Sequence, residues 1–218
     1  MRILKKHSDL FLSNFECHFF KGGRRKPPSF FINLPQKNEA MAIAGPFNLK
    51  KWIDDNRDLL KPPVSNKNLY TESGDYIVMI VGGPNARKDY HYNETEELFY
   101  QLEGDIVVTI QEDGKARKVE IKEGDMFLLP AKIPHNPVRP ANSVGLVVER
   151  VRKGTSNKDG LMWFCDNCNT KLHDTYFDLT NVEKDFQPRF REFYNSKELR
   201  TCTNCGHVME TDPRFTDE

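Results

Sequence analysis

Short apolar segments alternate with turn signals over residues 75–151 of this chain. The segments read DYIVMIV, ELFYQL, DIVVTI, RKVEIK, DMFLLP and SVGLVVERV. Turns such as EDG at 112–114 and EGD at 123–125 separate several of them. Short strands spaced by about 8–12 residues are typical of a β-sandwich or β-barrel. Because 38% of the 218 residues are hydrophobic, the chain can bury one such core, and we expect a mainly β fold.

Two segments outside this run have helical periodicity. Residues 46–61, PFNLKKWIDDNRDLLK, predict a helix that the Pro62-Pro63 pair ends. Its apolar face consists of Leu49, Trp52, Ile53 and Leu60. Residues 188–199, PRFREFYNSKEL, predict a second helix. Its apolar face consists of Phe190, Phe193 and Tyr194. Residues 153–160, KGTSNKDG, read as a linker.

These patterns divide the chain into three regions. Residues 1–44 are expected to form a poorly ordered or atypical basic extension, residues 45–160 the main domain, and residues 161–218 a C-terminal segment. The first 40 residues hold eight Lys or Arg, and their Gly and Pro pairs break any regular pattern. The extension could also be sequence from an upstream start, a mitochondrial transit peptide, which its acids count against, or a docking element.

Charge and cysteine content narrow the class of protein. The 32 basic residues equal the 32 acidic residues, so the composition does not favour a nucleic-acid partner. No apolar run approaches the roughly 20 residues that span a bilayer, so no membrane partner is expected. Four of the five cysteines form two CxxC pairs, which suits a metal and a reducing compartment. We therefore expect a cytoplasmic protein.

His91, Glu97 and His135 are candidate ligands of a catalytic metal. Two imidazoles and one carboxylate on one face of a sheet suit divalent iron and leave coordination positions open for substrate and oxygen. A single histidine on a strand is more often a packed or surface residue, and a glutamate among other acids is usually solvated. The combination of the three residues carries the prediction.

Two arginines and one acid accompany these ligands. Arg87 precedes His91 by four residues, and Arg139 follows His135 by four. The planar guanidinium grips a carboxylate through two charge-assisted hydrogen bonds. Glu149 stands in the apolar segment VGLVVER. It must therefore face solvent or have a positive partner, because an unpaired buried carboxylate costs several kcal/mol.

The spacing of these residues resembles the two motifs of the cupin family. The first motif is represented by His91, Asn93, Glu97 and Gly104, and the second by Gly124, Pro130 and His135. Asn93 replaces the second histidine of the first motif, and Lys132 stands where glycine is common. Losing one histidine leaves a two-His, one-Glu site with an additional position for a substrate that chelates through two atoms.

Longer stretches make the resemblance more specific. GGPNARKDYH, EELFYQLEGD, EGDMFLLPAKIPHNPVRP and VGLVVER, together with PFNLKKWIDDNRDLLKPPVSNK, resemble the 3-hydroxyanthranilate 3,4-dioxygenase family in order. The resemblance implies a cupin double-stranded β-helix barrel, or jelly roll, with a few helices and a small C-terminal rubredoxin-like metal-binding appendage. Only the first 40 residues fall outside it.

The resemblance also implies an activity. The family uses Fe(II) to open the ring of 3-hydroxyanthranilate with O2, giving 2-amino-3-carboxymuconate semialdehyde, which closes to quinolinate in the kynurenine pathway to NAD. It implies that His91, Glu97 and His135 bind the iron. Arg139, Glu149 and Glu97 would contact the substrate, and Arg87 would lie beside the dioxygen. It further implies a homodimer.

A second metal site is expected in the C-terminal segment. The two CxxC pairs place four thiolates at a spacing that binds iron or zinc tetrahedrally. These residues are Cys165, Cys168, Cys202 and Cys205. With all four positions filled by thiolates no position is open to substrate, so a structural role is favoured over electron transfer.

Three other functions compete with this interpretation. An iron cupin dioxygenase acting on another small aromatic or thiol substrate is the most serious. A cupin that only binds a small molecule would have substitutions at the ligand positions, which are intact here. A nucleic-acid-binding zinc ribbon would have a basic face, whereas residues 161–185 contain several acids.

Overall fold

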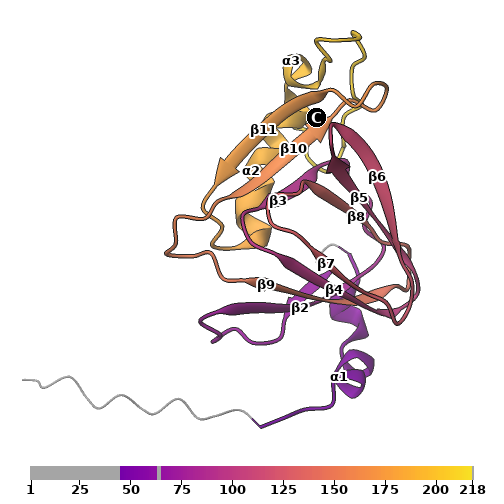
Figure 1. Cartoon of the computed structure of the whole chain (residues 1–218), viewed down its shortest axis with the longest axis vertical. Helices are drawn as coiled ribbons and strands as arrows, with labels where there is room; N and C mark the ends of the chain where they lie inside the picture. Colours follow the sequence, from indigo (N-terminus) through magenta and orange to yellow (C-terminus); the bar gives the residue numbers. More distant parts are fainter. Residues whose placement is uncertain (1–44, 63–64, 218) are drawn as a thin grey trace, which may run out of the picture. The chain divides into compact units, whose positions relative to one another are not determined.

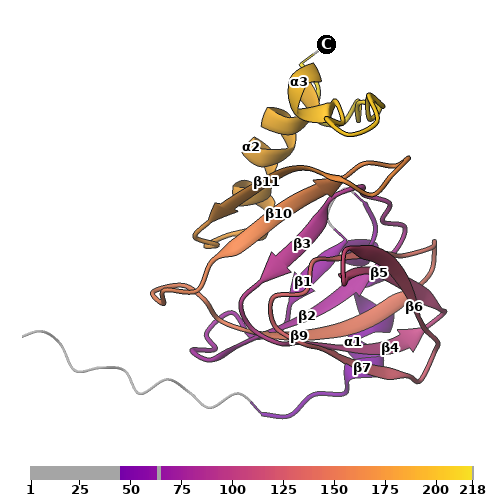
Figure 2. The ribbon, with the colours of Figure 1, turned by 45° about the horizontal axis from the view of Figure 1, so that its top comes forward.

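Two antiparallel β-sheets build the described part of the chain (Figures 1 and 2). The computed structural model describes residues 45–62 and 65–217, so the extension predicted at 1–44 lies outside it. One sheet has the order β1 (Asn66–Asn68), β2 (Tyr76–Gly82), β9 (Val144–Arg150), β4 (Glu97–Glu103) and β7 (Met126–Leu129). The other has the order β11 (Lys171–Phe177), β10 (Asp159–Phe164), β3 (Tyr90–Asn93), β8 (His135–Val138), β5 (Ile106–Glu112) and β6 (Lys115–Ile121).

The strand order confirms the predicted mainly β jelly-roll class. Strands distant in sequence are neighbours, as where β9 lies between β2 and β4 and β3 lies between β10 and β8. The apolar side chains of both sheets meet in one core. It consists of Phe99, Ile106, Val108, Ile110, Ile121, Leu129 and Val147. The site described below lies on the same two sheets.

The first predicted helix is present but consists of two pieces. α1 (Leu49–Asp55) begins where the Asn48 side chain accepts a hydrogen bond from the Lys51 N–H. The backbone leaves the helical region at Asn56, with φ −123° and ψ 20°, and continues as the 3-10 helix η1 (Arg57–Leu60). The predicted apolar face nevertheless packs as one cluster against the first sheet, on Ile80 and Val144.

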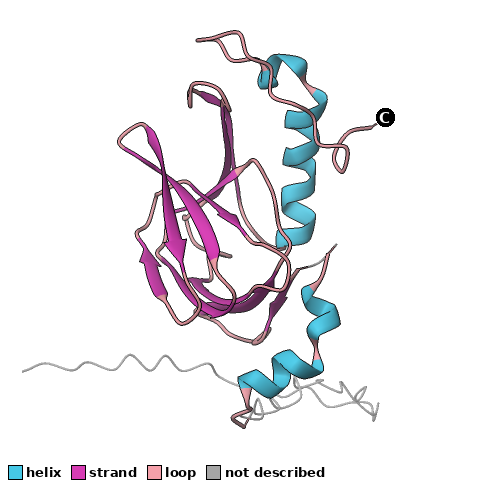
Figure 3. Ribbon diagram, turned by 90° about the vertical axis from the view of Figure 1, so that its right-hand side faces the viewer, coloured by secondary structure: helices cyan, strands magenta, loops and turns pink. Residues whose placement is uncertain are grey.

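The second predicted helix starts earlier than its sequence suggests. α2 (Val182–Asn195) begins at Asn181, whose side chain accepts from the Lys184 N–H, so Pro188 lies inside the helix. A separate short helix, α3 (Lys197–Arg200), follows Ser196. Aromatic residues of α2 form one buried cluster with residues of β10 and β11. Figure 3 shows the helices, in cyan, beside the strands, in magenta.

The linker predicted at 153–160 is shorter than expected. Asp159 and Gly160 begin β10, and β10 pairs with β3, the strand that carries His91. Residues from Phe47 onward form one compact unit. The boundary between 45–160 and 161–218 therefore falls within a strand of the sheet, and the division into separate folding units stays a prediction.

Candidate active site

Three potential metal ligands converge between the sheets. His91 lies on β3 opposite His135 at the start of β8, and Glu97 begins β4. One ligand atom from each residue lies within 4.8 Å of the ligand atoms of the other two. At most 9% of each residue is exposed. The structure thus brings together the three side chains whose spacing suggested a metal site.

The pair formed by His135 and Glu97 favours a cation. The His135 Nδ1–H donates to the Ile133 carbonyl oxygen over 3.1 Å, which leaves Nε2 3.1 Å from Glu97 Oε2. Burial lowers the pKa of His135, but the Glu97 carboxylate more than offsets this and the net shift is upward. Burial raises the pKa of Glu97, yet His135 brings it below its ordinary value. The raised pKa of His135 and the lowered pKa of Glu97 both show that positive charge is stabilised at this position, as a bound metal ion requires.

Glu149 is buried and has a positive partner. It is 4% exposed, and its Oε2 accepts a hydrogen bond from Arg152 Nη1 over 2.8 Å. A positive partner was expected for this carboxylate from its apolar sequence context, but the partner, Arg152, was not identified. The available signal was its position three residues after Glu149, just past the end of β9.

Asp159 is a further buried acid that the sequence reading assigned to a linker. Its Oδ1 lies 2.8 Å from His91 Nε2, and both of its oxygens accept hydrogen bonds from Arg152 over 2.7 Å. The residue is completely buried. The sequence did not identify Asp159 as a site residue, because Asp-Gly after a polar stretch is a common turn signal.

Arg139 is a buried guanidinium that forms no salt bridge with the residues that the structure describes, although the charge of Glu97 acts on it. It is 3% exposed, and Nη1 donates to the Gln101 side-chain oxygen over 3.3 Å. Burial lowers the pKa of Arg139 to about 10. A buried charge without a partner is costly, so this position suits an anionic ligand. Gly145 provides the space, since a Cβ there would lie 2.7 Å from Arg139 Nη1.

Arg87 lies at the edge of the site and is held on two sides. Its Nη2 is 3.1 Å from the buried Asp89 carboxylate. Its guanidinium carbon lies 5.6 Å from the ring centre of Phe186 and 5.5 Å from that of Phe190, both on α2. The Phe186 ring is also 5.6 Å from the His91 ring. Arg87 is thus linked to the metal-ligand cluster through an aromatic side chain.

The charges of the site call for a divalent cation. Glu97, Glu149 and Asp159 are buried carboxylates, while Arg139 and Arg152 are buried guanidiniums. With neutral imidazoles this set has one negative charge in excess. Burial, together with the charge of Glu97, raises the pKa of Glu149, which reflects the same excess. A divalent ion would reverse the balance and leave room for one anionic ligand, so the residues fit a metal.

A cavity of about 550 Å³ lies beside β1 and β2. Arg152 is part of its lining, together with Ile77, Met79 and Leu179. None of the residues predicted to bind metal, substrate or dioxygen lines this cavity, so it does not mark the place of the substrate.

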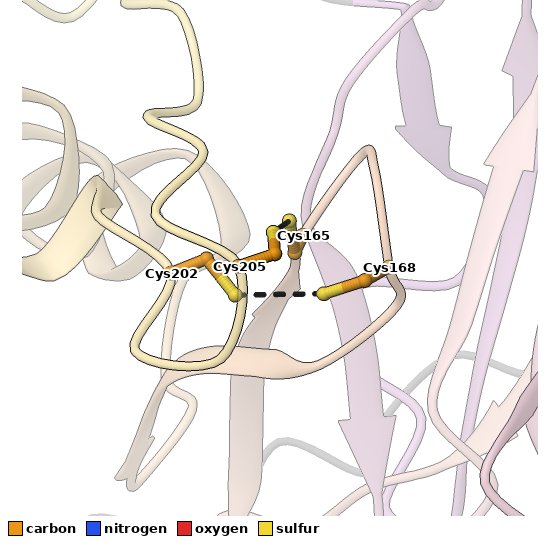
Figure 4. A group of neighbouring side chains, drawn as sticks. All are labelled: Cys165, Cys168, Cys202 and Cys205. Carbon is orange, nitrogen blue, oxygen red and sulfur yellow. Dashed lines mark hydrogen bonds between the residues drawn. The ribbon is translucent and has the colours of Figure 1, made fainter.

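Four cysteines form a second cluster, shown in Figure 4. The Sγ atoms of Cys165 and Cys205 are 3.7 Å apart, and those of Cys168 and Cys202 are 3.5 Å apart. Burial raises the pKa of Cys165 to about 11, whereas hydrogen bonds with Thr170 lower that of Cys168 to about 5. The structure thus gathers the four predicted thiol ligands, and such a set suits a tetrahedral metal.

Within the described residues, no helix is long and apolar enough to cross a membrane.

Comparison with known proteins identifies the family. Residues 41–194 match the family described as 3-HAO, 3-hydroxyanthranilic acid dioxygenase. A 3-hydroxyanthranilate 3,4-dioxygenase of Xanthomonas campestris pv. campestris (strain 8004) is 52% identical over 79% of this chain and 97% of its own length. Another, of Bacillus thuringiensis (strain Al Hakam), is 48% identical over 75% of this chain and 90% of its own. Among solved structures, a cupin-2 domain containing protein from Shewanella frigidimarina has 18% identity and a TM-score of 0.38, covering 45% of this chain and 91% of its own. The chain belongs to the 3-hydroxyanthranilic acid dioxygenase family.

Proposed function

We propose that this protein is a 3-hydroxyanthranilate 3,4-dioxygenase, which uses O2 to open the ring of its substrate. Both oxygen atoms enter the product, 2-amino-3-carboxymuconate semialdehyde, so no external electrons are consumed. Relatives with this activity in their names are about half identical over most of the chain. The observation that carries the proposal is the buried cluster of two histidines and one glutamate, together with Arg139, a buried guanidinium that has no salt bridge among the described residues and that the charge of Glu97 stabilises.

His91, Glu97 and His135 would hold Fe(II). Two imidazoles and one carboxylate are the donor set of many non-haem iron oxygenases. Bound Fe(II) supplies the redox chemistry that lets ground-state oxygen react with a closed-shell aromatic ring. The protein excludes water from this reaction, since the three ligands are buried.

Arg139 and Glu149 would bind the two ends of the substrate. Arg139 takes the substrate carboxylate, because its guanidinium can form a bidentate, charge-assisted pair. Glu149 uses Oε2 for its described hydrogen bonds, to Arg152 and Asn93. Its Oε1 is therefore available to accept a hydrogen bond from the hydroxyl or amino group of the substrate. The raised pKa of Glu149 suits it to hold a proton released there.

Arg87 would lie on the dioxygen side of the site. Its contact with Asp89 and its position over the rings of Phe186 and Phe190 limit its motion. A fixed positive charge stabilises negative charge that develops on oxygen during the reaction. The protein would thus supply fixed positive charge both at the substrate carboxylate, from Arg139, and near the dioxygen, from Arg87.

Oxygen uptake tests the proposal. Protein loaded anaerobically with Fe(II) is mixed with 3-hydroxyanthranilate, with 2-aminophenol, which lacks the carboxylate, or with cysteine as a thiol. We expect one O2 consumed per 3-hydroxyanthranilate, with a new absorption band, and much slower turnover of the other two compounds. Preference for cysteine or another aromatic compound would instead establish the competing iron dioxygenase activity. His135→Ala controls for oxygen uptake by free iron.

The second metal, held by the four cysteines, would be iron or zinc with a structural role. Elemental analysis of the purified protein distinguishes the two metals. The homodimer implied by the family resemblance and a cytoplasmic location stay predictions, which light scattering and cell fractionation test.

A further inference from the structure

Arg152 lies at the centre of the buried polar groups of the site. Its side chain is 1% exposed, and every guanidinium nitrogen is used. Nε and Nη2 donate to the two oxygens of Asp159, while Nη1 donates to Glu149 Oε2 and to the Arg150 carbonyl oxygen. One planar group therefore fixes two carboxylates at once, which a lysine ammonium cannot do with the same geometry.

Each of these carboxylates has a different neighbour in the site. Asp159 Oδ1 lies 2.8 Å from His91 Nε2. With the proton on Nε2, the His91 ring donates to Asp159 and presents the lone pair of Nδ1. Glu149 belongs to the substrate side, and Asn93 Nδ2 lies 3.4 Å from its Oε2.

Asn93 closes the series of contacts. The same Nδ2 lies 3.3 Å from Glu97 Oε2, and Glu97 is a potential metal ligand beside His135. Polar contacts thus run from His91 through Asp159, Arg152 and Glu149 to Asn93 and Glu97. The residue that replaces a cupin histidine takes part in this network.

We propose that Arg152 and Asp159 are positioning residues that connect the metal ligands to the substrate-binding acid. Asp159 orients the His91 ring for metal binding, and Arg152 orients both Asp159 and Glu149. The role of Glu149 in substrate binding rests on the proposed function. The role of Asp159 in metal binding rests only on its contact with His91. A carboxylate that holds a ligand histidine commonly changes metal affinity about 10–100-fold when it is removed.

Metal release separates this role from a structural one. Holoprotein is dialysed against increasing concentrations of a chelator, and the metal left per chain is measured, with the metal at the four cysteines as internal standard. We expect Asp159→Asn to lose the metal of the histidine site at a chelator concentration at least about tenfold below that for wild type. Glu149→Gln should retain metal like wild type but raise KM for 3-hydroxyanthranilate.

Arg152→Lys tests the connection between the two sides. It should both weaken metal retention and raise KM, while Arg150→Lys, a matched change two residues earlier at an exposed position, should do neither. If Arg152→Lys fails to fold, Asp159→Asn and Asp159→Glu carry the test. Normal metal retention in folded Asp159 variants, with only a lower melting temperature, would overturn the proposal. If wild type binds metal without consuming 3-hydroxyanthranilate, the proposed function fails, while the metal-release result still decides the role of Asp159.

Discussion

Gly145 on β9 shows how closely a single residue constrains Arg139, the residue proposed to bind the substrate carboxylate. An added Cβ would lie 2.7 Å from Arg139 Nη1 and 2.8 Å from Gln101 Oε1, the ends of two movable side chains. Gly145→Ala should therefore shift the guanidinium without unfolding the protein. Since hydrogen bonds to charged groups contribute about 1.5–3 kcal/mol, we expect KM in oxygen-uptake assays to rise roughly ten- to hundredfold. Gly74→Ala, at a position with open space, is the control and should leave KM unchanged.

Arg139 itself gives a second prediction. Arg139→Ala should raise KM for 3-hydroxyanthranilate about a hundredfold, because truncating one partner of a buried charge pair costs about 2–5 kcal/mol. Metal content should stay at the wild-type level, as Arg139 has no described hydrogen bond to a ligand residue. The slow turnover of 2-aminophenol should change less, since that compound has no carboxylate to lose. Parallel loss of metal and substrate binding would instead assign Arg139 a structural role.

Some site residues could be predicted from the sequence and others could not. His91, Glu97 and His135 follow a spaced motif, so their sequence separation already carried the information. Asp159 does not, because its partner His91 lies on another strand and the pairing of β10 with β3 brings the two together. Arg152 is close in sequence to both of its acids, but the sequence alone does not show that it is buried between them. The burial of Glu149 pointed to a partner, but a distance was needed to identify it.

At the scale of secondary structure, the apolar strands were predictable, including β4 with Glu97 and β9 with Glu149, whereas the two short strands that carry the histidines were not. β3 and β8 have four residues each, and they contain His, Asn and Pro rather than a run of apolar residues. Their extended conformation depends on neighbours, since both lie inside a sheet. Asn181 similarly starts α2 before Pro188, because a side-chain cap determined the start and the proline was tolerated within the helix.

The turn before β8 offers a stabilising substitution. Lys132, where the cupin motif often has glycine, has φ +67°. This left-handed conformation costs a residue with a Cβ about 1–2 kcal/mol, whereas glycine adopts it freely at some cost in chain entropy. The Lys132 side chain is exposed, so Lys132→Gly should raise the free energy of unfolding by up to about 1 kcal/mol. Chemical denaturation with unchanged KM would support this, and lower stability would contradict it.

At the scale of the whole described unit, β10 and the C-terminal segment complete the site. Asp159 on β10 reaches His91, and Phe186 on α2 contacts both His91 and Arg87. The chain between the two cysteine pairs includes β11 and α2, whose aromatic residues form one buried cluster with β10. The four-cysteine cluster therefore joins the two ends of a segment that supports the active site.

Removing one thiol distinguishes a structural metal from an electron carrier. Cys205→Ser should release one metal per chain, because a tetrahedral thiolate site loses much of its affinity with one ligand. The buried aromatic cluster of α2, β10 and β11 should still fold, but without the metal joining the ends of the segment. If the metal contributes about 2–3 kcal/mol, the melting temperature of a unit of this size should fall by roughly 5–10 °C. Below that temperature kcat should stay close to wild type, since the reaction needs no external electrons. Loss of turnover with an unchanged melting temperature and a normally loaded histidine site would instead assign the cluster a redox role.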